Sequence, residues 1–151
     1  MHLSVPAADF LKRVEVRLQQ LQPRKRIVFP EGDDPRVIQA ASRMAANNLL
    51  EPVLISHAAN PPADGLRRIN PDIDPATAGY AAYYLKRRAH RGATAREAQT
   101  VARRPLDFAA LMVASGDADG FLGGAANSTA VTVRAALHAI GAQKGVNTVS
   151  S

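Results

Sequence analysis

A glycine-rich corner in front of a helix is the part of the sequence best suited to bind an anion. A short apolar run ends at Gly123–Gly124, and the polar residues Asn127, Ser128 and Thr129 follow before the next helix. Glycines allow a tight turn and a close backbone approach to a ligand. The first N–H groups of a helix lack intrahelical partners and lie at its positive end, where phosphate binds readily. The corner therefore predicts a phosphate site.

Arg134 lies six residues after Ser128 and is long enough to reach back and add positive charge to this corner. A simpler interpretation is equally open from the motif alone. Ser128 is a good N-cap, so the same residues could form an ordinary strand-to-helix turn with nothing bound. On that interpretation Arg134 is a solvated helix residue.

Three carboxylates follow the first predicted strand, at Glu31, Asp33 and Asp34. Ligands of open α/β sheets gather at such strand ends. We favour a structural role, turn formation and helix N-capping, because Asp34 directly precedes Pro35, a residue typical of the first helical position. The four histidines are scattered without metal-ligand spacing, and Ser128 has no adjacent histidine. The residues therefore predict no metal site and no complete catalytic set.

The elements around these residues alternate between strands and helices. Arg26–Phe29 and Pro52–Ile55 are short apolar runs of strand type, and the helix between them begins at Asp34–Pro35. Such a β-α-β unit implies parallel strands. Between Ser56 and Pro75 only Leu66–Ile69 resembles a strand, and there is no room for a full helix. The remaining predicted elements are helices at Ala8–Gln20, Ala76–Arg91, Thr94–Ala102 and Thr132–Ile140, a helix that begins at Pro105 and is closed by Ser115–Gly116, a strand at Ala118–Leu122, and the start of a further strand at Val146–Ser151.

Composition limits the partners. The chain of 151 residues suits one domain with a buried core, and its net charge of +6 comes mostly from arginine. Arginine binds phosphate in a bidentate manner, which suits an anionic cofactor, nucleic acid or simple solubility. We rank nucleic acid low, because the sequence has no zinc-ligand spacing, no aromatic RNA-binding motif and no evident helix-turn-helix pattern.

The sequence contains no cysteine, so it forms no disulfide and no thiolate metal site. It has no apolar run long enough to span a membrane and no signal-peptide pattern at its start. These features predict a cytoplasmic protein that does not contact a membrane.

Taken in order, several segments resemble the phosphate acetyltransferase (phosphotransacetylase) family. Each motif alone is modest, but their ordered set, from about Leu11 to Ser151, is specific. The matching segments are Ile27–Val37, Tyr84–Gly92, Ala118–Gly120, Gly124–Ala130 with Arg134, and Gly145–Ser151.

The resemblance implies a three-layer α/β fold with a mostly parallel sheet, like that of isocitrate and isopropylmalate dehydrogenases. It also implies acetyl transfer between coenzyme A (CoA) and inorganic phosphate, with acetyl-CoA as a substrate and no permanently bound cofactor. By position, Arg88 and Arg134 match the arginines of the family's substrate cleft, and Ser128 and Thr129, with Gly124 and Asn127, match its phosphate corner.

The resemblance covers only the N-terminal half of such an enzyme. The family's second half contributes a Ser-Arg pair and a catalytic aspartate, and the segment after Ile55 is shorter than in the family. We therefore expect residues 1–151 to form a single partial domain that is inactive alone and associates as a homodimer or with a chain that supplies the second half. The alternative is a non-catalytic CoA- or phosphate-binding or regulatory module.

Overall fold

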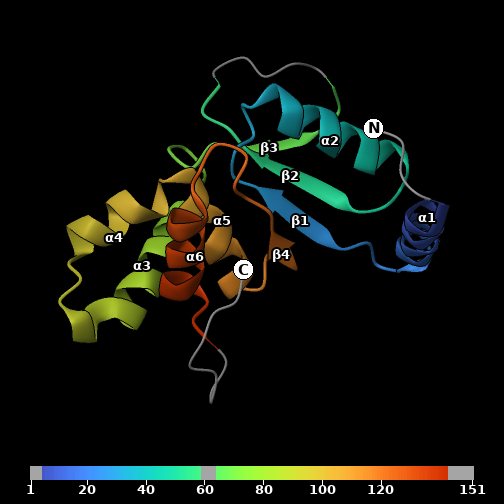
Figure 1. The fold of residues 1–151 in the computed structure, drawn as a ribbon. Coiled ribbons are helices and arrows are strands. Elements are labelled where there is room, and N and C mark those ends of the chain that lie inside the picture. The colour runs from blue at the N-terminus through green and yellow to red at the C-terminus, as the bar shows by residue number, and fades with distance from the viewer. Residues whose placement is uncertain (1–4, 59–63, 143–151) are drawn as a thin grey trace.

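The computed structural model describes residues 5–58 and 64–142 (Figure 1). It contains a sheet of four strands and a set of helices that lie on both of its faces. The strands are β1 (Arg26–Phe29), β2 (Glu51–Ile55), β3 (Arg67–Ile69) and β4 (Gly120–Phe121). The helices are α1 (Val5–Gln20), α2 (Pro35–Ala46), α3 (Ala76–Arg88), α4 (Ala95–Ala102), α5 (Pro105–Ala114) and α6 (Thr129–Ala139), with a 3₁₀ turn at Ala89–Arg91.

The sheet has the strand order β3-β2-β1-β4, and every neighbouring pair is parallel. Its pattern of buried side chains follows from strand geometry, since successive residues point to opposite faces. Val28 on β1 and Val53 on β2 belong to the larger core beneath α3, α4, α5 and α6. Phe29 and Leu54, one residue further along, belong to the smaller core beneath α2. Figure 1 shows these two helix groups on opposite sides of the sheet, which confirms the predicted three-layer α/β fold.

Local caps start three of the helices where the sequence predicts them. The Asp34 carboxylate accepts a hydrogen bond from the Arg36 N–H at 2.9 Å at the start of α2. Thr94 accepts from the Glu97 N–H at 3.1 Å before α4. Ser128 caps α6, which therefore begins at Thr129 rather than at Thr132 as predicted. Caps are local features, so residue types alone place them well.

Two further predictions about element boundaries are wrong, and a third is not tested by the described residues. The helix expected to reach Arg91 tightens into the 3₁₀ turn after Arg88, and Gly92 ends it with a positive φ of 82°. The strand expected over Ala118–Leu122 pairs as a strand only at Gly120–Phe121. The strand expected at Val146–Ser151 lies outside the described residues.

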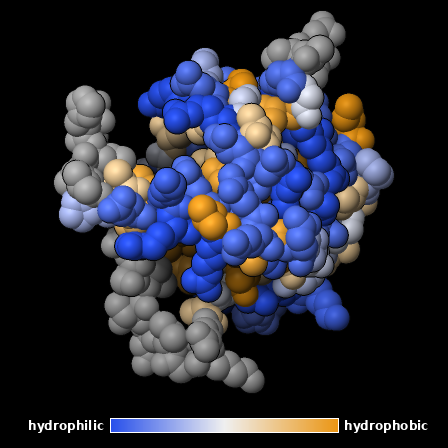
Figure 2. Space-filling model, turned by 90° about the vertical axis from the view of Figure 1, so that its right-hand side faces the viewer, coloured by the Kyte–Doolittle hydropathy of each residue, from blue (hydrophilic) through white to orange (hydrophobic). Residues whose placement is uncertain are grey.

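Helix α1 is the element least integrated into this fold. Several of its apolar side chains are exposed: Phe10 is 58% and Leu11 44% accessible to solvent. Gln19 donates to the Asn47 carbonyl at 3.0 Å and connects the end of α1 to the end of α2. Figure 1 shows α1 set apart from both helix groups, so it covers neither face of the sheet. The face of the molecule on this side is mostly hydrophilic, with small separate hydrophobic spots (Figure 2).

Among the described residues, no helix combines the length and the apolar character that a membrane crossing requires.

Candidate functional site

The candidate site lies where strands β1 and β4 end side by side. The chain leaves β1 towards α2 on one face of the sheet and leaves β4 towards α6 on the other. The strand order therefore changes direction between β1 and β4, which is the position where open parallel sheets form a ligand crevice. Two loops meet there: the β1–α2 turn at Pro30–Asp34 and the β4–α6 loop at Leu122–Ser128.

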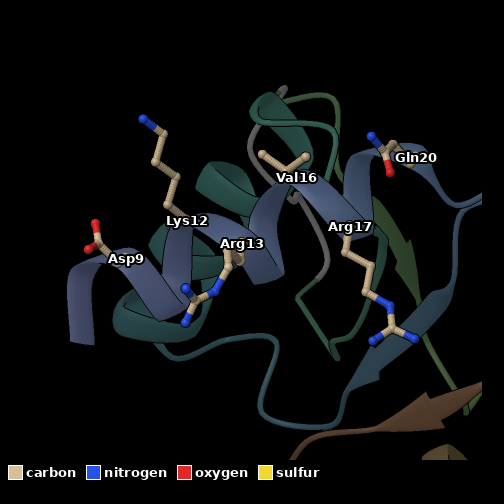
Figure 3. Close-up of a pocket in the computed structure, with 6 residues that line it drawn as sticks. All are labelled: Asp9, Lys12, Arg13, Val16, Arg17 and Gln20. Atoms are coloured by element: carbon tan, nitrogen blue, oxygen red, sulfur yellow. The ribbon is translucent and has the colours of Figure 1, made fainter. Parts of the chain in front are cut away.

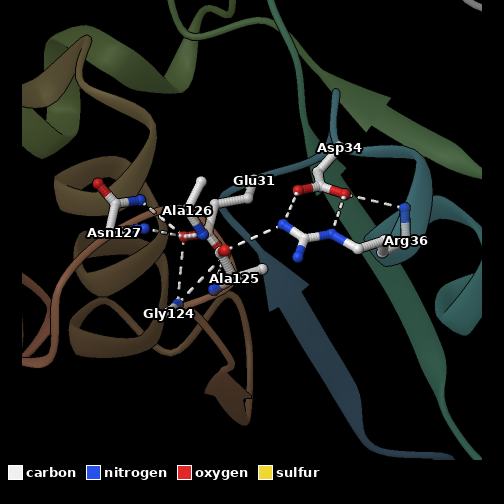
Figure 4. Close-up of polar contacts among 7 residues, drawn as sticks. All are labelled: Glu31, Asp34, Arg36, Gly124, Ala125, Ala126 and Asn127. Carbon is white, nitrogen blue, oxygen red and sulfur yellow. Dashed lines mark hydrogen bonds and ion pairs between the residues drawn. The ribbon is translucent and has the colours of Figure 1, made fainter.

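The N–H groups of the β4–α6 loop surround the carboxylate of Glu31 (Figure 4). Its Oε1 accepts from the N–H groups of Ala126 and Asn127 and from the Asn127 side-chain amide, each at 2.8 Å. Its Oε2 accepts from the N–H of Ala125 at 2.9 Å and from that of Gly124 at 3.1 Å. We call the donors of residues 124–127 the anion corner. The corner has the chemistry of an anion site, and its occupant in this structure is the protein's own carboxylate.

The three carboxylates after β1 thus have three different roles. Asp34 is the N-cap of α2, as predicted. The side chain of Glu31 neither forms the turn nor caps α2, and Asp33 instead contacts the Ser56 hydroxyl and accepts from the His57 N–H at 3.3 Å. The predicted capping role is therefore wrong for Glu31 and Asp33. Both join the β1–α2 turn to another segment of the chain.

Arg36 adds a second connection across the crevice. Its guanidinium donates to both oxygens of Asp34, at 3.1 and 2.6 Å, and to the Ala125 carbonyl at 3.0 Å. The Arg36 side chain, as hydrogen-bond donor and as positive charge, contributes to lowering the pKa of Asp34 to about 2. Figure 4 shows Arg36 and Glu31 reaching the same loop from the β1–α2 side. The negative side chain of Glu31 and the positive side chain of Arg36 therefore both connect the β1–α2 side to the β4–α6 loop.

The hydrogen bonds to Glu31 change its acidity. Burial by itself raises the pKa of Glu31, but the N–H groups of Ala126 and Ala125 and the two donors of Asn127 lower it to about 2, from an ordinary value of 4.5. Glu31 in the folded protein is therefore ionised at neutral pH and remains so well below pH 4.5.

This shift predicts a pH dependence of stability. Because the pKa of Glu31 is lower in the folded than in the unfolded state, its contribution is complete above about pH 4.5 and disappears as the pH falls towards 2. A pKa unit corresponds to about 1.4 kcal/mol, and since solvent screens a partly buried carboxylate, we expect a contribution of about 1–2 kcal/mol. Urea unfolding of the wild type and of Glu31→Gln should show a difference in unfolding free energy that shrinks on acidification. A difference independent of pH would contradict the assignment.

The two arginines predicted from the sequence lie together on the α6 side of the crevice. Arg88, from the end of α3, and Arg134, from α6, line one hollow of about 500 Å³. We call it the arginine hollow; its lining residues are Arg88, Arg91, Ala130, Val133, Arg134, Leu137 and His138. In the described part of the chain neither Arg88 nor Arg134 forms an ion pair with a carboxylate. Their charge is therefore available to an anion in the hollow.

The pKa of His138 reports the positive potential in this region. Burial lowers it first, and the charges of Arg88, Arg134 and Arg91 lower it further. The three guanidiniums around His138 make the region positive, which favours an anionic ligand.

A second hollow of about 500 Å³ adjoins the arginine hollow, because Arg134 and His138 line both. It is bounded by α4, the start of α5 and α6, and Asn127 of the anion corner also lines it. Its carboxylates are Glu97 and Asp107, and burial raises the pKa of Asp107. The crevice side of α6 therefore offers a positive hollow next to one of mixed charge.

The six predicted site residues therefore divide into two groups. Arg88 and Arg134 share the arginine hollow. Gly124 and Asn127 donate to Glu31, Ser128 caps α6, and Thr129 is the first residue of that helix. Sequence reasoning identified the anion corner but missed its occupant. The signal available was a glutamate directly after the first strand, at the end of the sheet where the corner lies.

Another hollow, of about 470 Å³, runs along α1 and is lined by Asp9, Lys12, Arg13, Val16, Arg17 and Gln20 (Figure 3). All six residues belong to one helix, so no other element closes over a ligand there. We therefore do not assign it as the functional site. Within the described residues there is also no group of three or more side chains able to hold a metal ion.

Comparisons with known proteins show which family the chain is similar to. The family model described as phosphate acetyl/butaryl transferase matches residues 9–151. A phosphate acetyltransferase of Paracoccus denitrificans is 44% identical over 127 residues, which are 84% of this chain and 39% of that protein. The phosphate acetyltransferase of Bacillus subtilis is 33% identical over 134 residues, with 83% and 41% covered.

Solved structures give the same result. The EutD phosphotransacetylase from Staphylococcus aureus superposes with a TM-score of 0.82 at 30% identity, covering 93% of this chain and 44% of that one. A phosphotransacetylase from Streptococcus pyogenes has a TM-score of 0.82 at 28% identity, with 97% and 46% covered. The chain thus spans less than half the length of these relatives. Because the phosphate acetyl/butaryl transferase model matches residues 9–151, which are most of the chain, the chain belongs to this family.

Proposed function

We propose that this chain carries the CoA- and phosphate-binding part of a phosphate acetyltransferase. The observation that carries the proposal is the common hollow of Arg88 and Arg134, which come from different helices and form no ion pair with a carboxylate in the described part of the chain. Guanidinium groups bind phosphate through paired, charge-assisted hydrogen bonds. Both proposed substrates, acetyl-CoA and inorganic phosphate, are anions.

In the proposed reaction a phosphate oxygen attacks the acetyl carbonyl carbon of acetyl-CoA. The C–S bond breaks, acetyl phosphate forms, and the thiolate of CoA takes up a proton. Arg88 and Arg134 would reduce the repulsion between the two anions and hold them in a reactive orientation, which can supply much of a rate enhancement. Ser128, Thr129, Gly124 and Asn127 would form the corner from which α6 and Arg134 extend.

We further propose that residues 1–151 are one part of a larger catalytic unit. By themselves these residues bind substrate without turning it over. The chain spans 39–46% of the relatives described above. Strand β4 ends one side of the sheet, and among the described residues its only strand partner is β1. Such a strand can pair with another chain. The proposed partner is therefore either a second copy of this chain or a complementing chain. A cytoplasmic location, where CoA esters are available, is part of the same proposal.

The second candidate, a CoA- or phosphate-binding module with no catalytic role, uses the same hollow. The two proposals differ in one measurement, the formation of acetyl phosphate when a chain carrying the remaining family segments is added. Turnover only in the mixture supports the split enzyme. Binding without turnover in the mixture supports the non-catalytic module.

Calorimetry with CoA tests the binding site itself. We expect Arg134→Ala or Arg88→Ala to weaken CoA binding about tenfold, equivalent to about 1.4 kcal/mol, because each removes a charged hydrogen-bond donor from the hollow. Arg13→Ala is the matched control, since it removes an arginine from the hollow on α1. A loss of affinity in Arg13→Ala but not in Arg134→Ala would move the site to α1 and refute the proposal.

A further inference from the structure

We propose that Glu31 is a positioning residue: its carboxylate is the built-in anion of the anion corner, and by holding that corner it orients α6 and Arg134. The second half of this inference rests on the proposed function, because Arg134 matters only if the arginine hollow binds substrate. The first half, that a tethered carboxylate occupies an anion site, stands on the contacts of Glu31 alone.

The number of hydrogen-bond donors that converge on Glu31 supports the inference that its carboxylate occupies an anion site. Four consecutive N–H groups and the Asn127 amide all point to one carboxylate, at distances from 2.8 to 3.2 Å. Consecutive N–H groups that point inwards form an anion-binding concavity. Residues 124–126 are exposed, so water can accept from their N–H groups one by one, but only an anion accepts from all of them at one point. The Glu31 carboxylate therefore holds these N–H groups in one common orientation.

Glu31 has an advantage over a free anion because it is covalently attached to the fold. The β1–α2 turn that carries it is held at Gly32, whose N–H donates to the Ile55 carbonyl at 3.0 Å. Arg36, in the first turn of α2, donates to the Ala125 carbonyl. An intramolecular ligand acts at a high effective concentration, which favours it over millimolar phosphate in solution. A substrate phosphate is then bound by the arginines beside the corner.

The connection from the corner to Arg134 is short and continuous. Asn127, which donates twice to Glu31, directly precedes the α6 cap Ser128. The Ser128 carbonyl accepts from the N–H groups of Val131 and Thr132, both at 3.1 Å, and forms the first turn of α6. Ala135 and Ala139 anchor the other side of α6 in the core. Arg134 lies between the fixed first turn and these anchors, so a displaced corner would move its guanidinium.

Rescue by formate tests whether the Glu31 carboxylate is the anion of the anion corner. In Glu31→Ala we expect the melting temperature to fall by about 5 °C, and sodium formate to restore most of it relative to sodium chloride at equal ionic strength. Formate is the smallest carboxylate and fits the space that the side chain leaves. Asp119→Ala is the control: it removes a carboxylate that accepts from the Lys25 side chain and from the single N–H of Arg26. A formate response in Glu31→Ala no larger than in Asp119→Ala overturns the proposal.

Glu31→Gln keeps the test decisive if the alanine variant does not fold. Glutamine fills the space and retains one acceptor, so we expect a smaller fall in melting temperature and no specific response to formate. A formate response in Glu31→Gln larger than in the wild type would overturn the proposal, because formate would then act at another place.

CoA affinity tests whether Glu31 orients α6 and Arg134. We expect Glu31→Ala to bind CoA about fivefold more weakly than the wild type, formate to restore its affinity, and Arg134→Ala to gain nothing from formate. Equal CoA affinity in the wild type and Glu31→Ala overturns the positioning role. If the wild type binds no CoA, the proposed function fails, while the formate response still decides whether Glu31 is the anion of the corner.

Discussion

Replacing Gly32 with alanine should lower the free energy of unfolding by about 3 kcal/mol. A Cβ at this position would lie 2.5 Å from the Ile55 carbonyl oxygen and 2.8 Å from the Leu54 Cβ. Both atoms belong to residues of β2 that are at most 1% exposed, and β2 is an inner strand of the sheet, so neither atom can move aside. The β1–α2 turn would have to move instead, and its hydrogen bond to Ile55 would be lost. Chemical denaturation measures the change.

The same shift should reach the candidate site, because Glu31 is the neighbour of Gly32. We expect the Gly32→Ala variant to lose part of the pH dependence that Glu31 provides in the wild type. Gly79→Ala is the matched control: a Cβ added in the middle of α3 meets no atom within 4 Å, and alanine favours a helix by up to about 1 kcal/mol. Similar effects in the two variants would show that Gly32 has no packing constraint.

Truncating Phe108 to alanine should cost about 4 kcal/mol of unfolding free energy. Phe108 is completely buried in the larger core, and its ring meets that of Tyr80 edge to face, with centroids 5.0 Å apart. Loss of the ring leaves a cavity between α5 and α3. Tyr80 is also held by its hydroxyl, which donates to the Asp117 carboxylate at 2.6 Å, so it cannot simply follow the missing ring.

Loss of Phe108 should also affect binding, because α3 carries Arg88 into the arginine hollow. Thermal unfolding together with CoA calorimetry measures both consequences on one sample. Phe10→Ala, which removes the same ring from a side chain that is 58% exposed on α1, should change stability by no more than about 0.5 kcal/mol. Equal losses in the two variants would contradict the burial that defines the core.

The sequence predicted local structure well, because local structure depends on neighbours in the chain. Asp34 before Pro35, Thr94 before Glu97, and Ser128 after the glycine pair each cap a helix, and each contact spans at most three residues. The short apolar runs predicted strands β1 and β2. The ordered motifs also indicated the family that the comparisons then confirmed.

The errors occur where a contact spans a large part of the chain. Glu31 and the anion corner are separated by 93–96 residues and meet only because the sheet places β1 beside β4. Helix α1 has a helical apolar pattern, but that pattern does not state whether a sheet face remains for it to cover. In the fold both faces are covered by other helices, and Phe10 stays exposed.

By itself, the sequence determined the helices, their caps, the parallel β-α-β order and a glycine-rich loop with free N–H groups before α6, since these depend on backbone geometry and side-chain type over a few residues. Only the tertiary structure decided that the anion is Glu31 and that Arg88 and Arg134 share one hollow. The physical reason is that strand order and helix packing determine which distant groups meet. Proximity in space, and not in sequence, therefore decides which carboxylate accepts from the converging N–H groups.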